Sequence, residues 1–245
     1  MQQAYRDDLA YIHDAGFGHL ARTAASFVTG HLRLSGIQDG TVVDLGCGSG
    51  ITARLLCDAG FSAVGIDLSE ALIQMARARV PEADFRVESF VTAVIPACVA
   101  VTGIGEVFSY AFDNANNNDT RAGVLGRIYG ALIPGGVLVF DIAGPNRAPS
   151  TDPQRTFREG TDWAVLVETE ADQDYKLLTR RITTFRKRGE WYRRDFEIHQ
   201  LQLLDPVEVL KMLQCIGFSA QVLDRYGTQV VPHGVTGFLA RKVPA

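Results

Sequence analysis

Hydrophobic positions in the first 145 residues follow two alternating patterns, one typical of buried strands and the other of amphipathic helices. Short, mostly apolar runs predict five strands, at residues 41–45, 63–67, 85–87, 99–102 and 137–142. Between the runs, apolar residues recur at helical spacing, for example at Ile51, Leu55, Leu56 and Ala59. A further amphipathic helix, around Leu20 to Leu32, precedes the first strand. Strands that alternate with helices predict right-handed βαβ crossovers and a mostly parallel sheet.

The pattern changes after residue 145, where the alternation of strand and helix stops. Residues 145–160 are typical of a loop, and residues 163–168, 177–187 and 190–204 predict consecutive strands joined by short polar turns. Strands without an intervening helix predict an antiparallel meander. Asp205, Pro206 and Glu208 have the spacing of a capped helix start, and two closing strands are predicted at residues 220–223 and 237–243.

The most informative segment is VVDLGCGSG, where the first strand turns into a helix. Glycines at 46, 48 and 50 permit positive φ and let a ligand approach the backbone, at the sheet edge where α/β proteins bind ligands. Asp67 ends the second strand 21 residues after Gly46, where a carboxylate can bind a ribose diol. The dinucleotide-binding motif G-x-G-x-x-G would need a glycine where Ile51 stands. Asp67 at the end of the second strand is compatible both with a dinucleotide and with another cofactor that carries a ribose.

Composition narrows the class of protein further. The net charge of -4 disfavours a nucleic-acid partner. The four cysteines lack the spacing of a zinc site and predict free thiols in a reducing compartment. No apolar run approaches the length of a membrane span, and we therefore expect a cytoplasmic protein with neither a metal nor a membrane partner.

VVDLGCGSG and the later GIDLS together resemble motif I and the acidic motif of class I S-adenosylmethionine-dependent methyltransferases. The resemblance runs from about Tyr5 to the C-terminus and implies S-adenosyl-L-methionine as the cofactor. It places Gly46, Cys47 and Gly48 at the amino-acid part of the cofactor. Asp44 can accept hydrogen bonds from the amine of that part. It also implies that Asp67 binds the ribose hydroxyls and that Leu68 lies against the adenine.

The same resemblance assigns four more cofactor contacts. The segment FRVESF matches the third-strand region, with Ser89 at the place of the residue that binds the adenine amino group and Phe90 beside it. Gly105 and Glu106 follow the fourth strand, where the family lines its methyl-transfer pocket. Tyr11 lies in AYIHDAGFG, which resembles a segment that covers the cofactor in some small bacterial methyltransferases.

Methyl transfer needs positioning more than acid–base chemistry, because the sulfonium is already an activated electrophile. A general base is needed only where the acceptor must lose a proton. Candidates for acceptor binding or base action are Glu106, Tyr110, Asp113 and His199. Seven basic residues between 180 and 194, with Trp191 and Tyr192 among them, predict either a solvated sheet face or a site for an anionic or aromatic acceptor.

The sequence therefore predicts an α/β fold with a doubly wound, mostly parallel, seven-stranded Rossmann-like sheet and an inserted antiparallel meander. We expect a helical cap in residues 1–40, a cofactor-binding core in 41–145, the insertion in 146–204 as wall or lid of the acceptor pocket, and a closing unit in 205–245. The predicted function is methyl transfer to a small molecule. The alternatives are an NAD(P)-dependent oxidoreductase on the same glycine turn and a non-enzymatic protein that binds S-adenosylmethionine.

Overall fold

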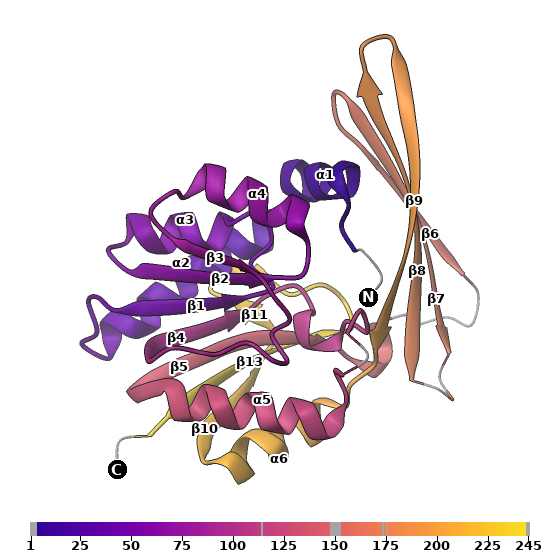
Figure 1. Cartoon of the computed structure of the whole chain (residues 1–245). Helices are drawn as coiled ribbons and strands as arrows, with labels where there is room; N and C mark the ends of the chain where they lie inside the picture. The colour runs from indigo at the N-terminus through magenta and orange to yellow at the C-terminus, as the bar shows by residue number, and fades with distance from the viewer. Residues whose placement is uncertain (1–3, 114, 148–152, 173, 175, 244–245) are drawn as a thin grey trace.

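The computed structural model describes residues 4–113, 115–147, 153–172, 174 and 176–243. Its main sheet has seven strands in the order β10-β13-β5-β4-β1-β2-β3, and β13 runs antiparallel to both of its neighbours (Figure 1). The predicted mostly parallel, doubly wound sheet is thus confirmed. The strands are β1 (Thr41–Leu45), β2 (Ser62–Asp67), β3 (Asp84–Val87), β4 (Cys98–Gly103), β5 (Leu132–Ala143), β10 (Phe218–Leu223) and β13 (Val235–Lys242).

Helices cover both faces of this sheet, as the alternation of patterns predicts (Figure 1). One face packs against α2 (His19–Leu34), α3 (Ile51–Asp58) and α4 (Glu70–Arg79), and the other against α5 (Asn118–Ala131) and α6 (Pro206–Ile216). The central strands are apolar because both faces are covered, and every residue of β4 is buried. The crossovers bring the carboxyl ends of β1, β2 and β4 to one edge of the sheet.

The helix starts follow their sequence signals. The Ser69 hydroxyl accepts from the Leu72 amide at the start of α4, and the Asp205 carboxylate accepts from the Val207 amide at the start of α6. In α5, Asn117 and Thr120 form a reciprocal capping box. These caps fix where the chain turns from loop to helix near the edge of the sheet.

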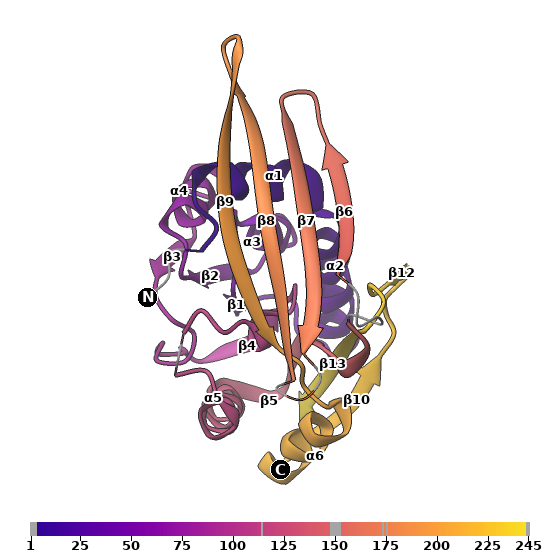
Figure 2. The ribbon, with the colours of Figure 1, turned by 90° about the vertical axis from the view of Figure 1, so that its right-hand side faces the viewer.

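The insertion forms a separate four-stranded antiparallel sheet in the order β6-β7-β8-β9, which stands beside the main sheet (Figure 2). Its strands are β6 (Gln154–Glu159), β7 (Trp163–Asp172), β8 (Leu177–Arg188) and β9 (Trp191–Gln202). β6 corrects the prediction of a loop over residues 145–160. Its residues are exposed and carry no alternating apolar pattern, so they form a strand only because β7 supplies the hydrogen-bonding partner.

The N-terminal helix α1 (Asp7–Phe17) lies between the two sheets (Figure 2). Leu9 and Ile12 pack against Trp163, Val165 and Ile182 of the insertion. On the other side, α1 contacts α4. The helix therefore joins the insertion to the half of the main sheet that carries the glycine turn.

Several short elements lie outside the predicted pattern. They are the 3₁₀ turns η1 (Val107–Ser109) and η2 (Pro145–Arg147) and the two-residue strands β11 (Arg225–Tyr226) and β12 (Gln229–Val230). β5 also begins at Leu132, five residues earlier than predicted, because an irregularity opposite Cys98 and Ala100 accommodates Pro134–Gly136 within the strand. Among the described residues, no helix is long and apolar enough to cross a bilayer.

Candidate active site

The glycine turn between β1 and α3 adopts the backbone conformation that its residues predict. Gly46, Gly48 and Gly50 all have positive φ, at 64°, 54° and 78°. A Cβ on Gly46 would lie 2.5 Å from Cγ2 of Val107, so this position needs glycine for space as well as for conformation. At Gly48 a Cβ would meet no atom within 4 Å, because this residue borders an open cavity.

Asp67 connects the turn to the next helix. One carboxylate oxygen accepts from the Gly48 amide at 2.9 Å and the other from the Ser69 amide at 2.8 Å. Burial raises the pKa of Asp67, and these N–H donors oppose that shift. The carboxylate is thereby held at the end of β2, beside the glycine turn.

These residues border a crevice at the carboxyl ends of the central strands, closed on one side by the N-terminal segment. The lining consists of Ala4, Tyr5, His13, Gly46, Gly48, Ile66, Asp67, Leu68, Ser69, Leu72, Glu88, Phe90, Ile104, Gly105, Val107, Tyr110 and Phe112. Seven predicted site residues lie in it: Gly46, Gly48, Asp67, Leu68, Phe90, Gly105 and Tyr110. The topology thus gathers residues from four separate loops at one opening.

Asp44 and Cys47 lie behind the crevice wall. One oxygen of Asp44 accepts from the Thr102 hydroxyl at 2.6 Å, whereas Oδ2 has no partner among the described residues. Burial raises the pKa of Asp44 to about 7. Cys47 packs in the core cluster with Phe85, and its amide already donates to the Ile66 carbonyl, so the structure does not place its side chain at a ligand.

Ser89 and Tyr11 are also outside the crevice, for different reasons. The Ser89 hydroxyl donates to the carboxylate of Asp113, and its neighbour Glu88 lines the crevice instead. Tyr11 points toward the insertion: its hydroxyl lies 3.2 Å from a carboxylate oxygen of Asp162, and the Arg186 guanidinium lies 3.0 Å from its ring centroid. The residues of the N-terminal segment that line the crevice are Ala4, Tyr5 and His13, of which only His13 belongs to the segment AYIHDAGFG.

Glu106 is buried and fully paired, so it is unsuited to act as a base. Its two carboxylate oxygens accept from Arg147 Nε and Arg180 Nη2, each at 2.7 Å. Burial raises the pKa of Glu106, but the two guanidinium groups outweigh this effect and lower the pKa overall. Its backbone is left-handed, with φ of 65°, and is held there because Asp141 accepts from the amides of Gly105 and Glu106.

Tyr110 lies at the crevice with a partner that the sequence analysis missed. Its hydroxyl is 2.8 Å from the hydroxyl of Tyr5 and 3.5 Å from Nη1 of Arg180. Burial raises the pKa of both tyrosines, so both hydroxyls keep their protons at neutral pH. The pair can donate and accept hydrogen bonds at the crevice, which both residues line.

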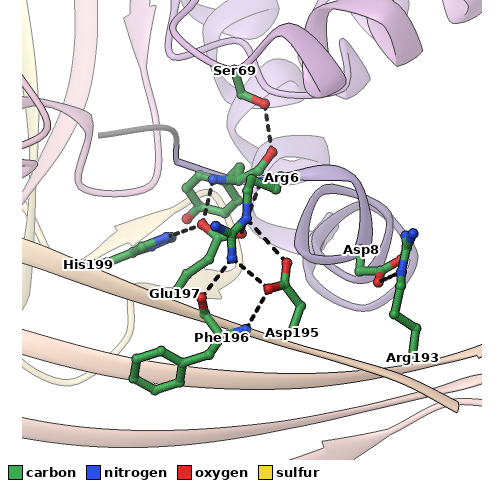
Figure 3. Close-up of polar contacts among 9 residues, drawn as sticks. Arg6, Asp8, Ser69, Arg193, Asp195, Phe196, Glu197 and His199 are labelled. Atoms are coloured by element: carbon green, nitrogen blue, oxygen red, sulfur yellow. Dashed lines mark hydrogen bonds and ion pairs between the residues drawn. The ribbon is translucent and has the colours of Figure 1, made fainter. Parts of the chain in front are cut away.

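His199 lies one layer behind these aromatic rings. Its ring centroid is 4.8 Å from those of Tyr5 and Phe112 and 6.0 Å from that of Tyr110. Nε2 is 2.9 Å from a carboxylate oxygen of Glu197, and Nδ1 has no partner among the described residues (Figure 3). The histidine therefore supports the wall of the crevice and is not among its lining residues.

The arginines of the insertion are mostly neutralised by carboxylates. Arg180 pairs with Glu106, Arg186 with Asp162, and Arg181 with Glu168 and Glu170. Arg188 and Arg193 both contact the buried carboxylate of Asp8 on α1. Arg180, Arg188 and Arg193 thus fasten the insertion to the rest of the chain, and Arg181 and Arg186 form pairs within it. Both kinds of pair favour the structural interpretation over an anion site.

The residues of the crevice fit S-adenosylmethionine. The donor carries an ammonium and a sulfonium, and the acids Asp67, Glu88 and the incompletely bonded Asp44 lie at or beside the crevice. Gly48 leaves the backbone open at its floor, where a Cβ would occupy the space of a ligand.

Comparison with known proteins agrees with this geometry. Residues 42–136 match a family model described as a methyltransferase domain. The putative methyltransferase YqeM of Bacillus subtilis is 25% identical over 186 residues, which cover 74% of each chain. The trans-aconitate 2-methyltransferase of Paracidovorax citrulli is 37% identical over 120 residues, which cover 48% of this chain and 43% of that protein. The chain thus spans about half the length of several of the curated relatives that it matches.

Solved structures share the fold over nearly the whole chain. An S-adenosylmethionine-dependent methyltransferase from Clostridium acetobutylicum has a TM-score of 0.80 at 17% identity, covering 96% of this chain and 98% of that one. The amino pentose methyltransferase CalS10 from Micromonospora echinaspora has a TM-score of 0.76 at 16% identity, with 95% and 96% covered. The motifs, the strand order and these relatives together identify the chain as a class I S-adenosylmethionine-dependent methyltransferase.

Proposed function

We propose that the enzyme methylates a small molecule that binds beside the hydroxyls of Tyr5 and Tyr110. One observation carries this proposal: the Gly48–Asp67 corner and the paired tyrosine hydroxyls belong to residues that line the same crevice. Such an arrangement supplies a place for a methyl donor and a neighbouring place for an acceptor. The insertion, residues 146–204, supports the wall of the acceptor side from behind through His199, and residues 1–40 serve as the cap.

The cofactor contacts follow from the positions of the side chains. The Asp67 carboxylate, at the end of β2, binds the two ribose hydroxyls, and Leu68 and Phe90 pack against the adenine ring. Gly48 leaves space for the amino-acid part, and Gly46 lets the turn pass close to Val107. The free oxygen of Asp44 attracts the cofactor's ammonium group from beneath the turn.

The chain contributes positioning to the reaction more than acid–base chemistry. When bound, S-adenosylmethionine would supply an activated methyl group to the acceptor and would leave as S-adenosylhomocysteine. The tyrosine hydroxyls would orient the acceptor atom through hydrogen bonds, which is the positioning that the transfer needs. Since burial raises the pKa of Tyr110, this residue orients the acceptor as a neutral hydroxyl and does not remove its proton.

The lining of the crevice favours an aromatic acceptor over a multiply charged anion. Tyr5, His13, Tyr110 and Phe112 contribute rings to the crevice, and the nearest guanidinium, that of Arg180, is neutralised by Glu106. Burial lowers the pKa of His13 to about 4, so this ring is uncharged at neutral pH. The tricarboxylate trans-aconitate and the amino sugars, which appear in the names of relatives, are the contrasting classes to test.

Two measurements test the proposal. Titration calorimetry should show binding of S-adenosylmethionine and of its demethylated product S-adenosylhomocysteine, but not of NAD or NADP. Transfer of a tritiated methyl group should then be screened over phenolic, amino-sugar and tricarboxylate acceptors. Binding without labelling of any acceptor in a cell extract would favour a non-enzymatic sensor, and no binding of either ligand by the folded protein would refute the function.

Replacing Tyr110 with Phe distinguishes binding of the acceptor from binding of the cofactor. The variant should lower kcat/KM by about tenfold, the effect of losing one hydrogen bond in the transition state, with the Kd for S-adenosylhomocysteine unchanged. Tyr192→Phe is the matched control, because Tyr192 is exposed on β9 away from the crevice. Equal activities of the two variants would contradict the acceptor position.

A further inference from the structure

The first residues of the described chain form a strap across the mouth of the crevice. We define the strap as residues 4–6; Ala4 and Tyr5 line the crevice, and Arg6 precedes α1. Tyr5 has φ of 52°, a left-handed conformation that is uncommon for a bulky residue. Such a conformation persists only where surrounding contacts over-determine it, so the fastenings of the strap are informative.

The strap is tied to both parts of the molecule. On the cofactor side, the Tyr5 carbonyl accepts from the Ser69 hydroxyl at 2.8 Å, two residues beyond Asp67. On the side of the insertion, the amides of Tyr5 and Arg6 donate to the carboxylate of Glu197 at 2.8 Å and 2.9 Å. A bidentate pair between Arg6 and Asp195 strengthens the outer rim (Figure 3).

Glu197 is the residue at which these connections meet. It lies on the inner face of β9, is 7% exposed, and accepts from Tyr5, Arg6 and His199 Nε2. A buried carboxylate needs several donors to offset its lost hydration, and two of these three come from the strap. Opening the strap would leave the carboxylate with His199 as its remaining close donor, so Glu197 favours the closed position.

The third partner of Glu197 reaches the acceptor side of the crevice. His199 is 1% exposed and packs against Tyr5, Tyr110 and Phe112, the rings that line the proposed acceptor position. A carboxylate at Nε2 selects the tautomer that carries its proton there and leaves Nδ1 as an acceptor. The orientation of His199, and hence the packing of the aromatic wall, depends on the same carboxylate that holds the strap.

We propose that Glu197 is a positioning residue that couples closure of the strap over the cofactor to the orientation of His199 behind the acceptor wall. The inference rests on the proposed function, because it assigns the cofactor and the acceptor to neighbouring parts of the crevice. Its consequence is an ordered site: the aromatic wall is set for an acceptor only when the strap lies across the cofactor. Glu197 acts through its three partners and touches neither substrate.

Glu197→Gln is the principal variant. Oε2 of Glu197 accepts from both the Tyr5 amide and His199 Nε2, and Oε1 accepts from the Arg6 amide, so a glutamine, which turns an NH2 group toward one side, cannot accept from all three donors. The Kd for S-adenosylhomocysteine should rise about tenfold, the scale of one lost charged hydrogen bond. The preference of His199 for the Nε2–H tautomer should weaken in its ¹⁵N spectrum, because a neutral amide oxygen is a weaker acceptor than a carboxylate. Glu197→Asp keeps the charge and should recover part of the affinity for S-adenosylhomocysteine and part of the tautomer preference of His199.

Asp195→Asn is the matched control, because it removes the Arg6 partner on the half-exposed rim and leaves Glu197 intact. It should change the Kd less than about threefold, as expected for a surface ion pair. Wild-type affinity and tautomer in Glu197→Gln, or an equal loss in Asp195→Asn, would overturn the coupling. Failure of the wild-type enzyme to bind S-adenosylhomocysteine would instead refute the proposed function.

Hydrogen exchange of the wild-type chain provides a test that does not depend on the folding of a variant. The amides of Tyr5 and Arg6 should be protected from exchange, and S-adenosylhomocysteine should slow their exchange further. Protection of neither amide in the complex would overturn the inference, since both would then lack the carboxylate partner.

Discussion

Replacing Asp67 with Asn tests the cofactor position most directly. In the free protein this carboxylate accepts from the amides of Gly48 and Ser69 at 2.9 Å and 2.8 Å, which aims it at the mouth of the crevice. A ribose diol would add two charge-assisted hydrogen bonds, and an amide can accept only one of them. We expect a loss of about 1.5–3 kcal/mol, or roughly 10- to 150-fold in the Kd for S-adenosylhomocysteine.

The same substitution should also cost some stability. One of the two backbone amides loses its acceptor, which corresponds to about 1 kcal/mol and a fall in Tm of roughly 2–4 °C. Calorimetric titration below the Tm of both proteins separates the two effects. The control is Asp84→Asn on β3, because this exposed carboxylate pairs with Arg86 and lies away from the crevice.

Affinity should also depend on pH through the same carboxylate. Burial raises the pKa of Asp67, so the wild-type affinity should begin to fall at a higher pH than for an ordinary aspartate as the solution is acidified. An Asp67→Asn Kd within twofold of the wild-type value would show that the ribose binds elsewhere.

Two further predictions concern the floor of the crevice. Gly48→Ala should lose about 1–2 kcal/mol of stability, because the φ of Gly48 is 54°. The new methyl group meets no protein atom, so its main effect should be to abolish cofactor binding. Wild-type affinity of this variant in calorimetry would contradict the prediction. Burial raises the pKa of Asp44 to about 7, so the folded protein retains a proton that the unfolded chain loses near pH 4. The free energy of unfolding of the wild type should therefore fall by up to about 1.4 kcal/mol per pH unit between those values, relative to Asp44→Asn. If the free energies of unfolding of the two proteins, measured in urea, changed in parallel with pH, the raised pKa of Asp44 would be refuted.

The sequence alone determined the main sheet and the place of the glycine turn and Asp67 at its edge. Those features depend on local signals: buried β-branched runs, helical periodicity, caps at Ser69 and Asp205, and glycines where the turn requires positive φ. Asp67 could be placed because a strand ends there, and a strand end has a known position in a parallel sheet. The insertion was predicted except for β6, whose exposed residues carry no pattern of their own.

Only the tertiary structure decided which side chains line the proposed acceptor position. Tyr5 lies next to Tyr110, 105 positions away in the sequence, because α1 packs against the insertion and the residues that precede this helix reach the crevice. Contacts between distant segments also turned Tyr11 toward Asp162, paired Glu106 with two arginines and joined Glu197 to the strap. These roles follow from contacts between distant segments, which no periodicity along the chain encodes.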